Sequence, residues 1–244
     1  MTETDPPHDP DHPIRAFRLT REEAEDRRQG GDIEDIFFKG EGRPANKWID
    51  YLPIYERYFS PFRDAGPTLL EIGVGQGGSL DLWRRYFGPD ATICGIDVKP
   101  VCATRVSPPN LVRIGSQDDE RFLKSVIGEI GPPDIILDDG SHMAAHQTAG
   151  FRILWPELKD GGLYVIEDTH TAYWNEFGGG YRKDGTAIDL AARLIDDMHA
   201  WFHQQATEFA AREEIAAVHA HESILIIEKR KKARPGHIRI GRKN

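Results

Sequence analysis

Two acidic pairs, each at the end of a short apolar run, are the residues of this sequence with the clearest chemical potential. Asp138 and Asp139 end one run, and Glu167 and Asp168 end the next. If both runs are neighbouring parallel strands, their carboxyl ends meet at the edge where open α/β sheets bind ligands. Four carboxylates gathered there would repel one another unless a positive charge lay between them. A hard divalent cation, Mg²⁺ or Mn²⁺, prefers such oxygen ligands, and we predict that Asp139, Glu167 and Asp168 bind it.

His142 follows the first acidic pair within the run Asp-Asp-Gly-Ser-His. A hydroxyl group ionises far above neutral pH, so a reaction that uses it as a nucleophile must remove its proton. A metal lowers the pKa of a bound hydroxyl, and a nearby imidazole can accept the proton, so we predict that His142 is a general base. In the competing interpretation the terminal aspartates cap helices and His142 is structural. His146 and His170 are further candidates for contact with a substrate.

A glycine-rich segment follows an earlier apolar run and precedes an amphipathic one. It reads Glu-Ile-Gly-Val-Gly-Gln-Gly-Gly-Ser from residue 71 to residue 79. Glycines allow sharp turns and close approach of the backbone to a ligand. The spacing differs from the dinucleotide pattern G-x-G-x-x-G and is similar to the S-adenosylmethionine motif. The predicted cofactor contacts in this segment are Glu71, Gly73, Gly75, Gly77 and Ser79.

Further cofactor contacts are predicted at the ends of the next strands. Asp97 lies about 20 residues beyond the glycines, where a carboxylate can accept hydrogen bonds from both ribose hydroxyls of either a dinucleotide or S-adenosylmethionine. The turn after the third strand contains Ser116, Gln117 and Asp118, any of which could contact adenine or instead cap a helix that begins near Asp119. Our predicted contacts are Ser116 and Gln117, together with Asp138 from the first acidic pair.

The elements that must position these residues alternate between apolar runs and amphipathic stretches. Such alternation indicates a parallel sheet covered by helices on both faces. The last two runs are too close for a crossover helix and must pair as an antiparallel hairpin. We therefore predict a single-domain, Rossmann-like α/β fold of the class I methyltransferase type, with a mostly parallel seven-stranded sheet. The predicted strands are Thr68–Ile72, Thr92–Ile96, Leu111–Ile114, Asp134–Asp138, Gly162–Ile166, Ile215–His219 and Ser223–Glu228, and two predicted helices are Pro53–Arg63 and Ala187–Gln205.

Composition divides the 244 residues into four parts. We predict a disordered segment at 1–14, rich in Pro, Asp and His, then a helical cap at 15–66. The S-adenosylmethionine-binding domain is predicted at 67–229 and a basic tail at 230–244. The formal net charge is −9, yet residues 229–244 contain eight Lys and Arg and no acid, so the rest carries −17. So acidic a body argues against nucleic acid as a partner.

The sequence also predicts where the protein works. No apolar run approaches the roughly 20 residues that span a membrane, and no signal peptide is recognisable, so no membrane partner is expected. The two cysteines, Cys94 and Cys102, fall in a predicted buried strand and the loop after it, which makes a disulfide improbable. A reducing cytoplasm fits best.

Taken together, these motifs resemble the metal-dependent O-methyltransferases of macrolide sugars, of the mycinamicin and macrocin type. The resemblance extends from Trp48 to Glu228 and includes D-D-G-S-H, the run G-G-L-Y-V-I-E-D with T-A-Y-W at Thr171–Trp174, and the closing V-H-A-H-E-S-I-L-I-I-E-K. It implies S-adenosylmethionine as co-substrate, magnesium, and transfer of a methyl group to a hydroxyl of a small, glycosidic molecule. By position, Asp139, Glu167 and Asp168 match magnesium ligands and His142 the base, whereas Glu71, Gly73, Gly75 and Asp97 match cofactor contacts.

The resemblance also has limits. Relatives of this type carry an additional N-terminal region that this chain is too short to contain, and Ser116 stands where such a relative has Asp. Family members are often homo-oligomers, so the aromatic helix around Tyr55 and the basic tail are candidate subunit contacts. Three alternatives remain: a catechol-type O-methyltransferase, an NAD-dependent oxidoreductase, and a cofactor-binding subunit without catalysis.

Overall fold

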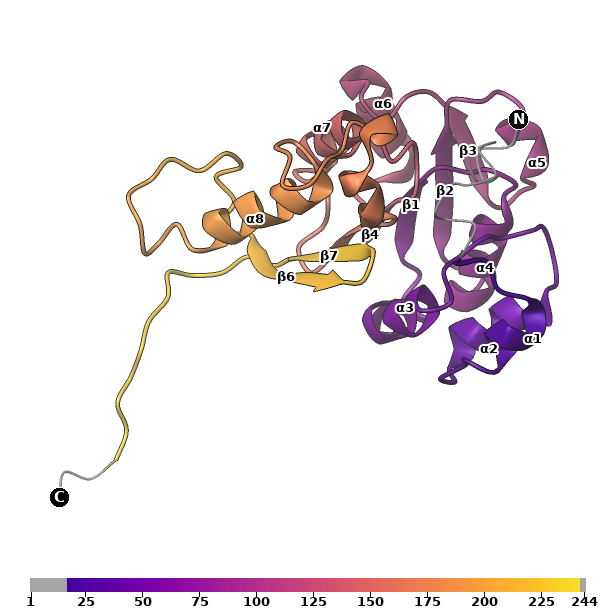
Figure 1. The fold of residues 1–244 in the computed structure, drawn as a ribbon, viewed down its shortest axis with the longest axis horizontal. Helices are drawn as coiled ribbons and strands as arrows, with labels where there is room; N and C mark the ends of the chain where they lie inside the picture. The colour runs from indigo at the N-terminus through magenta and orange to yellow at the C-terminus, as the bar shows by residue number, and fades with distance from the viewer. Residues whose placement is uncertain (1–16, 242–244) are drawn as a thin grey trace.

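A computed structural model describes residues 17–241 of the chain. The predicted disordered segment 1–14 lies outside the described residues, as do the first two residues of the predicted cap and the last three of the predicted tail. The remainder of that tail, from residue 230 to 241, contains no helix or strand and extends away from the body of the molecule (Figure 1).

The described chain forms one seven-stranded sheet in the order β3-β2-β1-β4-β5-β7-β6. The first five strands are parallel, whereas β7 pairs antiparallel with both β5 and β6. This topology confirms the predicted class I methyltransferase fold with its C-terminal hairpin. The strands are β1 (Thr68–Ile72), β2 (Thr92–Asp97), β3 (Leu111–Ile114), β4 (Ile135–Asp138), β5 (Leu163–Ile166), β6 (Ile215–His221) and β7 (Ile224–Lys229).

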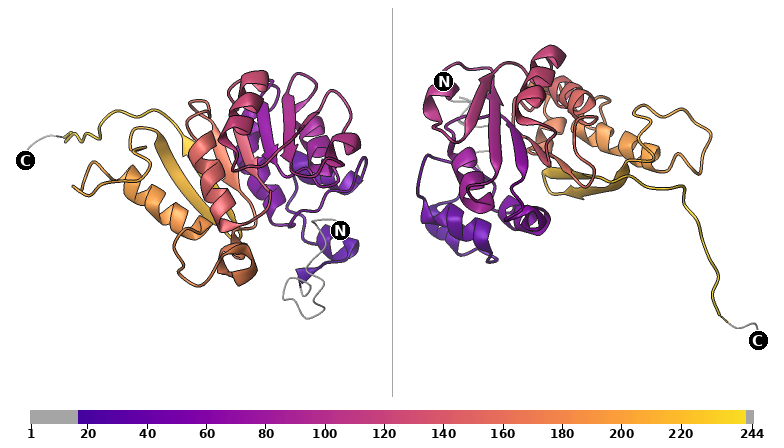
Figure 2. Two further views of the ribbon diagram at one scale, coloured as in Figure 1. Left: turned by 90° about the horizontal axis from the view of Figure 1, so that it is seen from above. Right: turned by 180° about the vertical axis from the view of Figure 1, so that it is seen from behind.

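Helices cover both faces of the sheet, as the near-continuous apolar strands require (Figure 2). Every residue of β1, β4 and β5 is buried. Alternate side chains of β1 enter two separate apolar clusters: Leu69 packs with Trp83 on one face, and Leu70 packs with Phe151 on the other. The first cluster is covered by α2 (Asp32–Lys39), α3 (Tyr51–Phe59) and α4 (Gly78–Phe87), and the second by α6 (Glu120–Ile130), α7 (Ala144–Leu154) and α8 (Ala187–Met198).

Two predicted helices have different bounds in the structure. The helix expected at Pro53–Arg63 begins at Tyr51 and ends at Phe59, and a 3₁₀ turn at Ser60–Phe62 follows it. The helix expected at Ala187–Gln205 ends at Met198. Beyond its end, the buried Asp197 carboxylate accepts backbone hydrogen bonds from Phe209 and Ala211, so the following loop folds back against the last turn of the helix.

The remaining elements are short. They are α1 (Arg21–Glu25), α5 (Cys102–Arg105), and the 3₁₀ turns η3 (Thr169–Tyr173) and η4 (Asn175–Phe177). Cys94 and Cys102 are both buried, and neither forms a disulfide within residues 17–241. Among residues 17–241, every helix is too short or too polar to cross a membrane.

Candidate functional site

The two acidic pairs meet at the carboxyl edge of the sheet, as predicted. In the ladder, Ile72 of β1 pairs with Asp138 of β4, which pairs in turn with Ile166 of β5. Asp139 and Glu167 each come one residue beyond this register, so their side chains leave the sheet at the same level. The site therefore lies beside the glycine-rich loop that follows β1, at the place where open α/β sheets bind ligands.

Three side chains at this edge are close enough to share a metal ion. One ligand atom from each of Asp139, His142 and Asp168 lies within 4.8 Å of the others. His142 Nε2 is 3.6 Å from Asp168 Oδ2 and 4.0 Å from Asp139 Oδ1. Both His142 and Asp168 have positive φ, a conformation in which a side chain is strained and which is common at functional sites. Glu167, the third predicted metal ligand, is not in this group.

Glu167 is instead held by Lys47, a residue that the sequence analysis did not identify. The Lys47 side chain is only 1% exposed, and its Nζ donates to both oxygens of Glu167, at 2.8 and 2.9 Å, and also to Asp139 Oδ2. Burial alone would lower the pKa of Lys47, but the carboxylates of Asp139, Glu167 and Glu71 raise it above its ordinary value. The lysine is therefore cationic and supplies part of the positive charge that the sequence analysis assigned entirely to a metal.

Aromatic donors from α3 and from Trp48, which precedes it, complete the surroundings of the acids. Trp48 Nε1 and the Tyr51 hydroxyl donate to Asp168 Oδ1 at 3.0 and 2.9 Å, and the Tyr55 hydroxyl donates to Glu167. Burial and the nearby carboxylates raise the pKa of Tyr51 and of Tyr55, so both remain protonated donors. Tyr55 is fully buried, so a subunit contact through the aromatic helix around it, which stays a prediction, would involve other side chains of that helix.

Glu71 lies beneath the glycine-rich loop and is fully buried. Trp83 Nε1 donates to its Oε2 at 3.2 Å, and Ser79 also hydrogen-bonds to the carboxyl group. Its other oxygen, Oε1, has no hydrogen-bond partner and is 4.0 Å from Lys47 Nζ. Burial raises the pKa of Glu71 to about 7, although Lys47 acts in the opposite direction.

This shift predicts a dependence of stability on pH that Glu71→Gln removes. Because the folded state binds the Glu71 proton more tightly than the unfolded state, wild-type stability should fall as pH rises from 4.5 toward 7. A shift of this size corresponds to about 3 kcal/mol between those pH values. Urea unfolding of the metal-free protein at pH 5 and pH 7.5 tests this prediction. The free energy of unfolding of Glu71→Gln should rise relative to that of the wild type as the pH rises. If the free energies of unfolding of the two proteins change equally with pH, the raised pKa of Glu71 is contradicted.

The glycines of the loop are required by their neighbours as well as by the turn. Gly73, Gly75 and Gly77 all have positive φ. A Cβ atom on Gly73 would lie 2.0 Å from the carbonyl oxygen of Asp139, and one on Gly78 would lie 2.2 Å from that of Pro44. The loop therefore packs directly on the backbone of the acidic edge on one side and on the segment before Lys47 on the other.

Asp97 fastens the loop to β2. Its Oδ2 accepts backbone N–H groups of Val74 and Gly75 at 3.0 and 3.2 Å, and its Oδ1 accepts that of Lys99 at 2.9 Å. Burial would raise the pKa of Asp97, but these hydrogen bonds lower it below the usual value, so the group is ionised. Its side chain does not cap α5, the helix that follows β2, and its contact with a ribose stays a prediction.

The residues predicted to contact adenine divide into two groups. Gln117 is buried and bonds to the predicted site itself: its Nε2 donates to both oxygens of Asp138, at 3.2 and 3.0 Å, and its Oε1 accepts the Ser141 N–H. Ser116 instead donates to the exposed Asp118. Burial raises the pKa of Asp138 to about 6. Contact of any of these residues with a cofactor stays a prediction.

An aromatic rim borders the acidic group, which it meets at Trp48, whose Nε1 donates to Asp168. Ring contacts lead from Phe17 to Trp48, from Trp48 to His170, and onward to Trp174, with centroid distances of 5.8, 5.4 and 4.8 Å. Two further contacts, through Phe177, return to His142. The other candidate histidine, His146, hydrogen-bonds to Ser141 at 2.8 Å.

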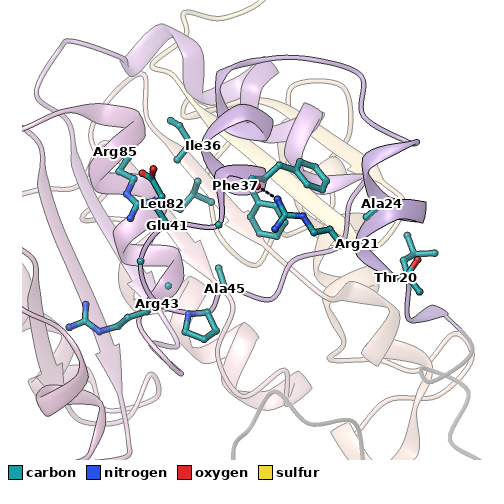
Figure 3. Close-up of a pocket in the computed structure, with 16 residues that line it drawn as sticks. Thr20, Arg21, Ala24, Ile36, Phe37, Glu41, Arg43, Ala45, Leu82 and Arg85 are labelled. Atoms are coloured by element: carbon teal, nitrogen blue, oxygen red, sulfur yellow. Dashed lines mark hydrogen bonds between the residues drawn. The ribbon is translucent and has the colours of Figure 1, made fainter.

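A cavity of about 390 Å³ lies on the N-terminal side of the segment that leads to Lys47. Figure 3 shows five of the residues that line it, Phe37, Arg43, Ala45, Leu82 and Arg85. None of the predicted site residues lines this cavity.

Comparison with known proteins identifies relatives of the whole fold. No family model matches the chain. It is 37% identical over 214 residues to the 8-demethyl-8-alpha-L-rhamnosyl tetracenomycin-C 2'-O-methyltransferase of Streptomyces olivaceus, covering 81% of this chain and 55% of that protein. It is 36% identical over 196 residues to the mycinamicin VI 2''-O-methyltransferase of Micromonospora griseorubida, covering 73% and 48%. The chain is a homologue of sugar O-methyltransferases.

Solved structures agree with this homology. The MycE methyltransferase in complex with Mg, SAH and mycinamycin VI superimposes with a TM-score of 0.74 at 31% identity, covering 83% of this chain and 54% of that one. The O-methyltransferase from Bacillus cereus in complex with SAH gives a TM-score of 0.54 at 14% identity, which supports the fold alone. The chain spans about half the length of the sugar O-methyltransferases that it matches.

Proposed function

We propose that this protein is an S-adenosylmethionine-dependent and Mg²⁺-dependent O-methyltransferase that acts on a sugar hydroxyl of a glycosylated natural product. The observation that carries the proposal is the convergence of Asp139, His142 and Asp168 beside the glycine-rich loop of a class I methyltransferase fold. Homology to sugar O-methyltransferases, one of which was solved with Mg and SAH, supports both the cofactor and the acceptor class.

The side chains at the edge fit a hard divalent cation. Asp139 and Asp168 offer carboxylate oxygens within 4.8 Å of each other, which is the donor chemistry that Mg²⁺ and Mn²⁺ prefer. We propose Asp139, Glu167 and Asp168 as the residues that hold the cation. When bound, the cation would lower the pKa of an acceptor hydroxyl and so favour its ionisation.

The chain's own residues then have separable tasks. The glycine-rich loop and Asp97 would bind the cofactor, and the acidic edge would place the acceptor oxygen in line with the methyl group and the sulfonium sulfur. His142 Nε2 would accept the hydroxyl proton as the oxygen–carbon bond forms and the carbon–sulfur bond breaks. Asp168 Oδ2, 3.6 Å away, would stabilise the resulting imidazolium. The cofactor supplies the reactive sulfonium, so the protein's contribution is binding, alignment and proton removal.

The aromatic rim supports an acceptor with apolar surface next to its hydroxyls. Rings of Trp48, Trp174 and Phe177 border the acidic group, and such rings line small-molecule sites generally. A catechol would also place two oxygens on the cation and is the second candidate acceptor. The homologues favour the sugar, because two of them are named as the 2'-O- and the 3'-O-methyltransferase of rhamnosyl tetracenomycin-C compounds.

Calorimetry tests the proposed function directly. S-adenosylmethionine and NAD are titrated separately into the protein, each with and without Mg²⁺. We expect binding of S-adenosylmethionine and none of NAD, whereas tight NAD binding without S-adenosylmethionine binding would restore the oxidoreductase alternative. We further propose a cytoplasmic, homo-oligomeric protein. Two buried cysteines with no disulfide between them support the compartment, and the acidic body with its basic tail supports self-association.

Asp97→Ala is expected to weaken S-adenosylmethionine binding about 10- to 100-fold, the cost of losing hydrogen bonds to a charged group. The variant loses both the proposed ribose contact and the anchor of Val74 and Gly75. Isothermal titration of the cofactor measures the effect, with Asp134→Ala as the control, because the Asp134 carboxylate also accepts a backbone N–H, that of Thr68, but at the opposite end of the sheet. An unchanged dissociation constant would exclude Asp97 from the cofactor site.

A further inference from the structure

The segment between α2 and α3 crosses the carboxyl edge of the sheet and ends in the acidic group. Arg43 pairs with Asp81 of α4 at 3.3 Å, and Pro44 packs on the backbone of Gly78. Three residues later Lys47 reaches Glu167 and Asp139. The position of the lysine is thus fixed from both sides, by contacts to α4 before it and by the start of α3 after it.

The lysine divides the acidic oxygens into two sets. Asp139 Oδ1 and Asp168 Oδ2 face His142, at 4.0 and 3.6 Å, and belong to the group that can share a cation. The oxygens on the other side, Asp139 Oδ2 and both oxygens of Glu167, accept hydrogen bonds from Lys47 Nζ. Glu167 also accepts one from Tyr55, and it is 2% exposed. A cation that recruits Glu167 would therefore bind an oxygen that already accepts a hydrogen bond from the ammonium group.

We propose that Lys47 is a positioning residue that competes with the divalent cation for Glu167 and thereby weakens metal binding at this edge. This proposal rests on the proposed function, since it takes Asp139 and Asp168 as ligands of that cation. The lysine neutralises Glu167 and Asp139 in the metal-free protein, where buried carboxylates without a partner would be costly. The same ammonium then repels the cation and occupies Glu167, a possible third ligand. The lysine therefore stabilises the metal-free fold and lowers its affinity for the metal.

The test measures Mn²⁺ binding by calorimetry in the wild type, Lys47→Met, Glu167→Gln and the double variant. Lys47→Met should bind Mn²⁺ at least about tenfold more tightly, in the range by which residues behind the ligands alter metal affinity. Glu167→Gln should weaken binding much more in the Lys47→Met background than in the wild type, because only there is Glu167 released. The melting temperature of metal-free Lys47→Met should fall, and its rise on adding Mn²⁺ should exceed that of the wild type.

Lys159→Met is the matched control. Lys159 pairs with Asp134 at 2.7 Å, and Asp134 directly precedes β4, whereas Asp139 directly follows it. It should leave the Mn²⁺ affinity unchanged. If Lys47→Met does not fold, Lys47→Gln removes the charge but keeps a donor for Glu167, and should also tighten binding. Unchanged or weaker binding in the Lys47 variants, or an equal effect of Glu167→Gln in both backgrounds, overturns the proposal. A wild type that binds no Mn²⁺ would instead refute the proposed metal site itself.

Discussion

His142→Ala is expected to lower turnover about 10²- to 10⁴-fold, the contribution typical of a general base. The acceptor hydroxyl would still meet the sulfonium, but nothing at Nε2 would take its proton as the new bond forms. Cofactor binding should be little changed, because the loop is held to Asp97 through the backbone of Val74 and Gly75, and His142 takes no part in these hydrogen bonds. Single-turnover rates at saturating cofactor, together with calorimetry of the cofactor, separate these two effects.

The same variant distinguishes a base from a metal ligand, since His142 lies within the group that could share a cation. A base leaves Mn²⁺ affinity nearly unchanged on removal, whereas a ligand does not. His219→Ala provides the matched control, because His219 also pairs with an acid, Glu228, at 2.7 Å, and lies outside the group that could share a cation. Near-normal turnover of His142→Ala would remove it as the base, and a loss of Mn²⁺ affinity would reassign it as a ligand.

The place of each acidic pair at the end of a strand was predictable, because the local sequence alone indicates it. An apolar run that ends in acids predicts a strand and its carboxyl end, and the parallel register of β1, β4 and β5 brings those ends together. The glycine-rich loop was predictable for the same reason: Gly73 and Gly77 lie where positive φ and close packing exclude a side chain.

The partners of those acids were not predictable from the sequence. Lys47 is 92 residues from Asp139 and 120 from Glu167, and Tyr51 is 117 from Asp168. Lys47 belongs to no periodic pattern, because it lies in an irregular segment whose path is set by contacts with α4. The tyrosines of α3 do form a helical stripe, but periodicity shows only that such side chains are buried and cannot show that their hydroxyls reach carboxylates.

The positive charge at the acidic edge has a second source that the sequence did not reveal. Four carboxylates at one edge do require positive charge, and the sequence analysis assigned all of it to a metal. In the structure one lysine neutralises part of it, so the acidic cluster by itself does not establish how tightly a cation binds. What distinguishes the edge proposed to hold the cation is the pair Asp139 Oδ1 and Asp168 Oδ2, which face His142 and accept no hydrogen bond from the lysine.

Asp139→Ala is accordingly expected to abolish metal-dependent turnover and to weaken Mn²⁺ binding by at least about 100-fold. Asp139 Oδ1 faces His142 and the Asp168 group, so its loss leaves a single carboxylate facing the cation while Lys47 still occupies Glu167. Asp134→Ala is a close control: the two side chains are 23% and 22% exposed, each pairs with a lysine, and they lie at opposite ends of β4. Both variants lose an acid–lysine pair, but only Asp139→Ala should lose Mn²⁺ binding and turnover while retaining S-adenosylmethionine affinity. Equal effects of the two substitutions would mean that Asp139 acts through stability, and the metal site would have to lie elsewhere.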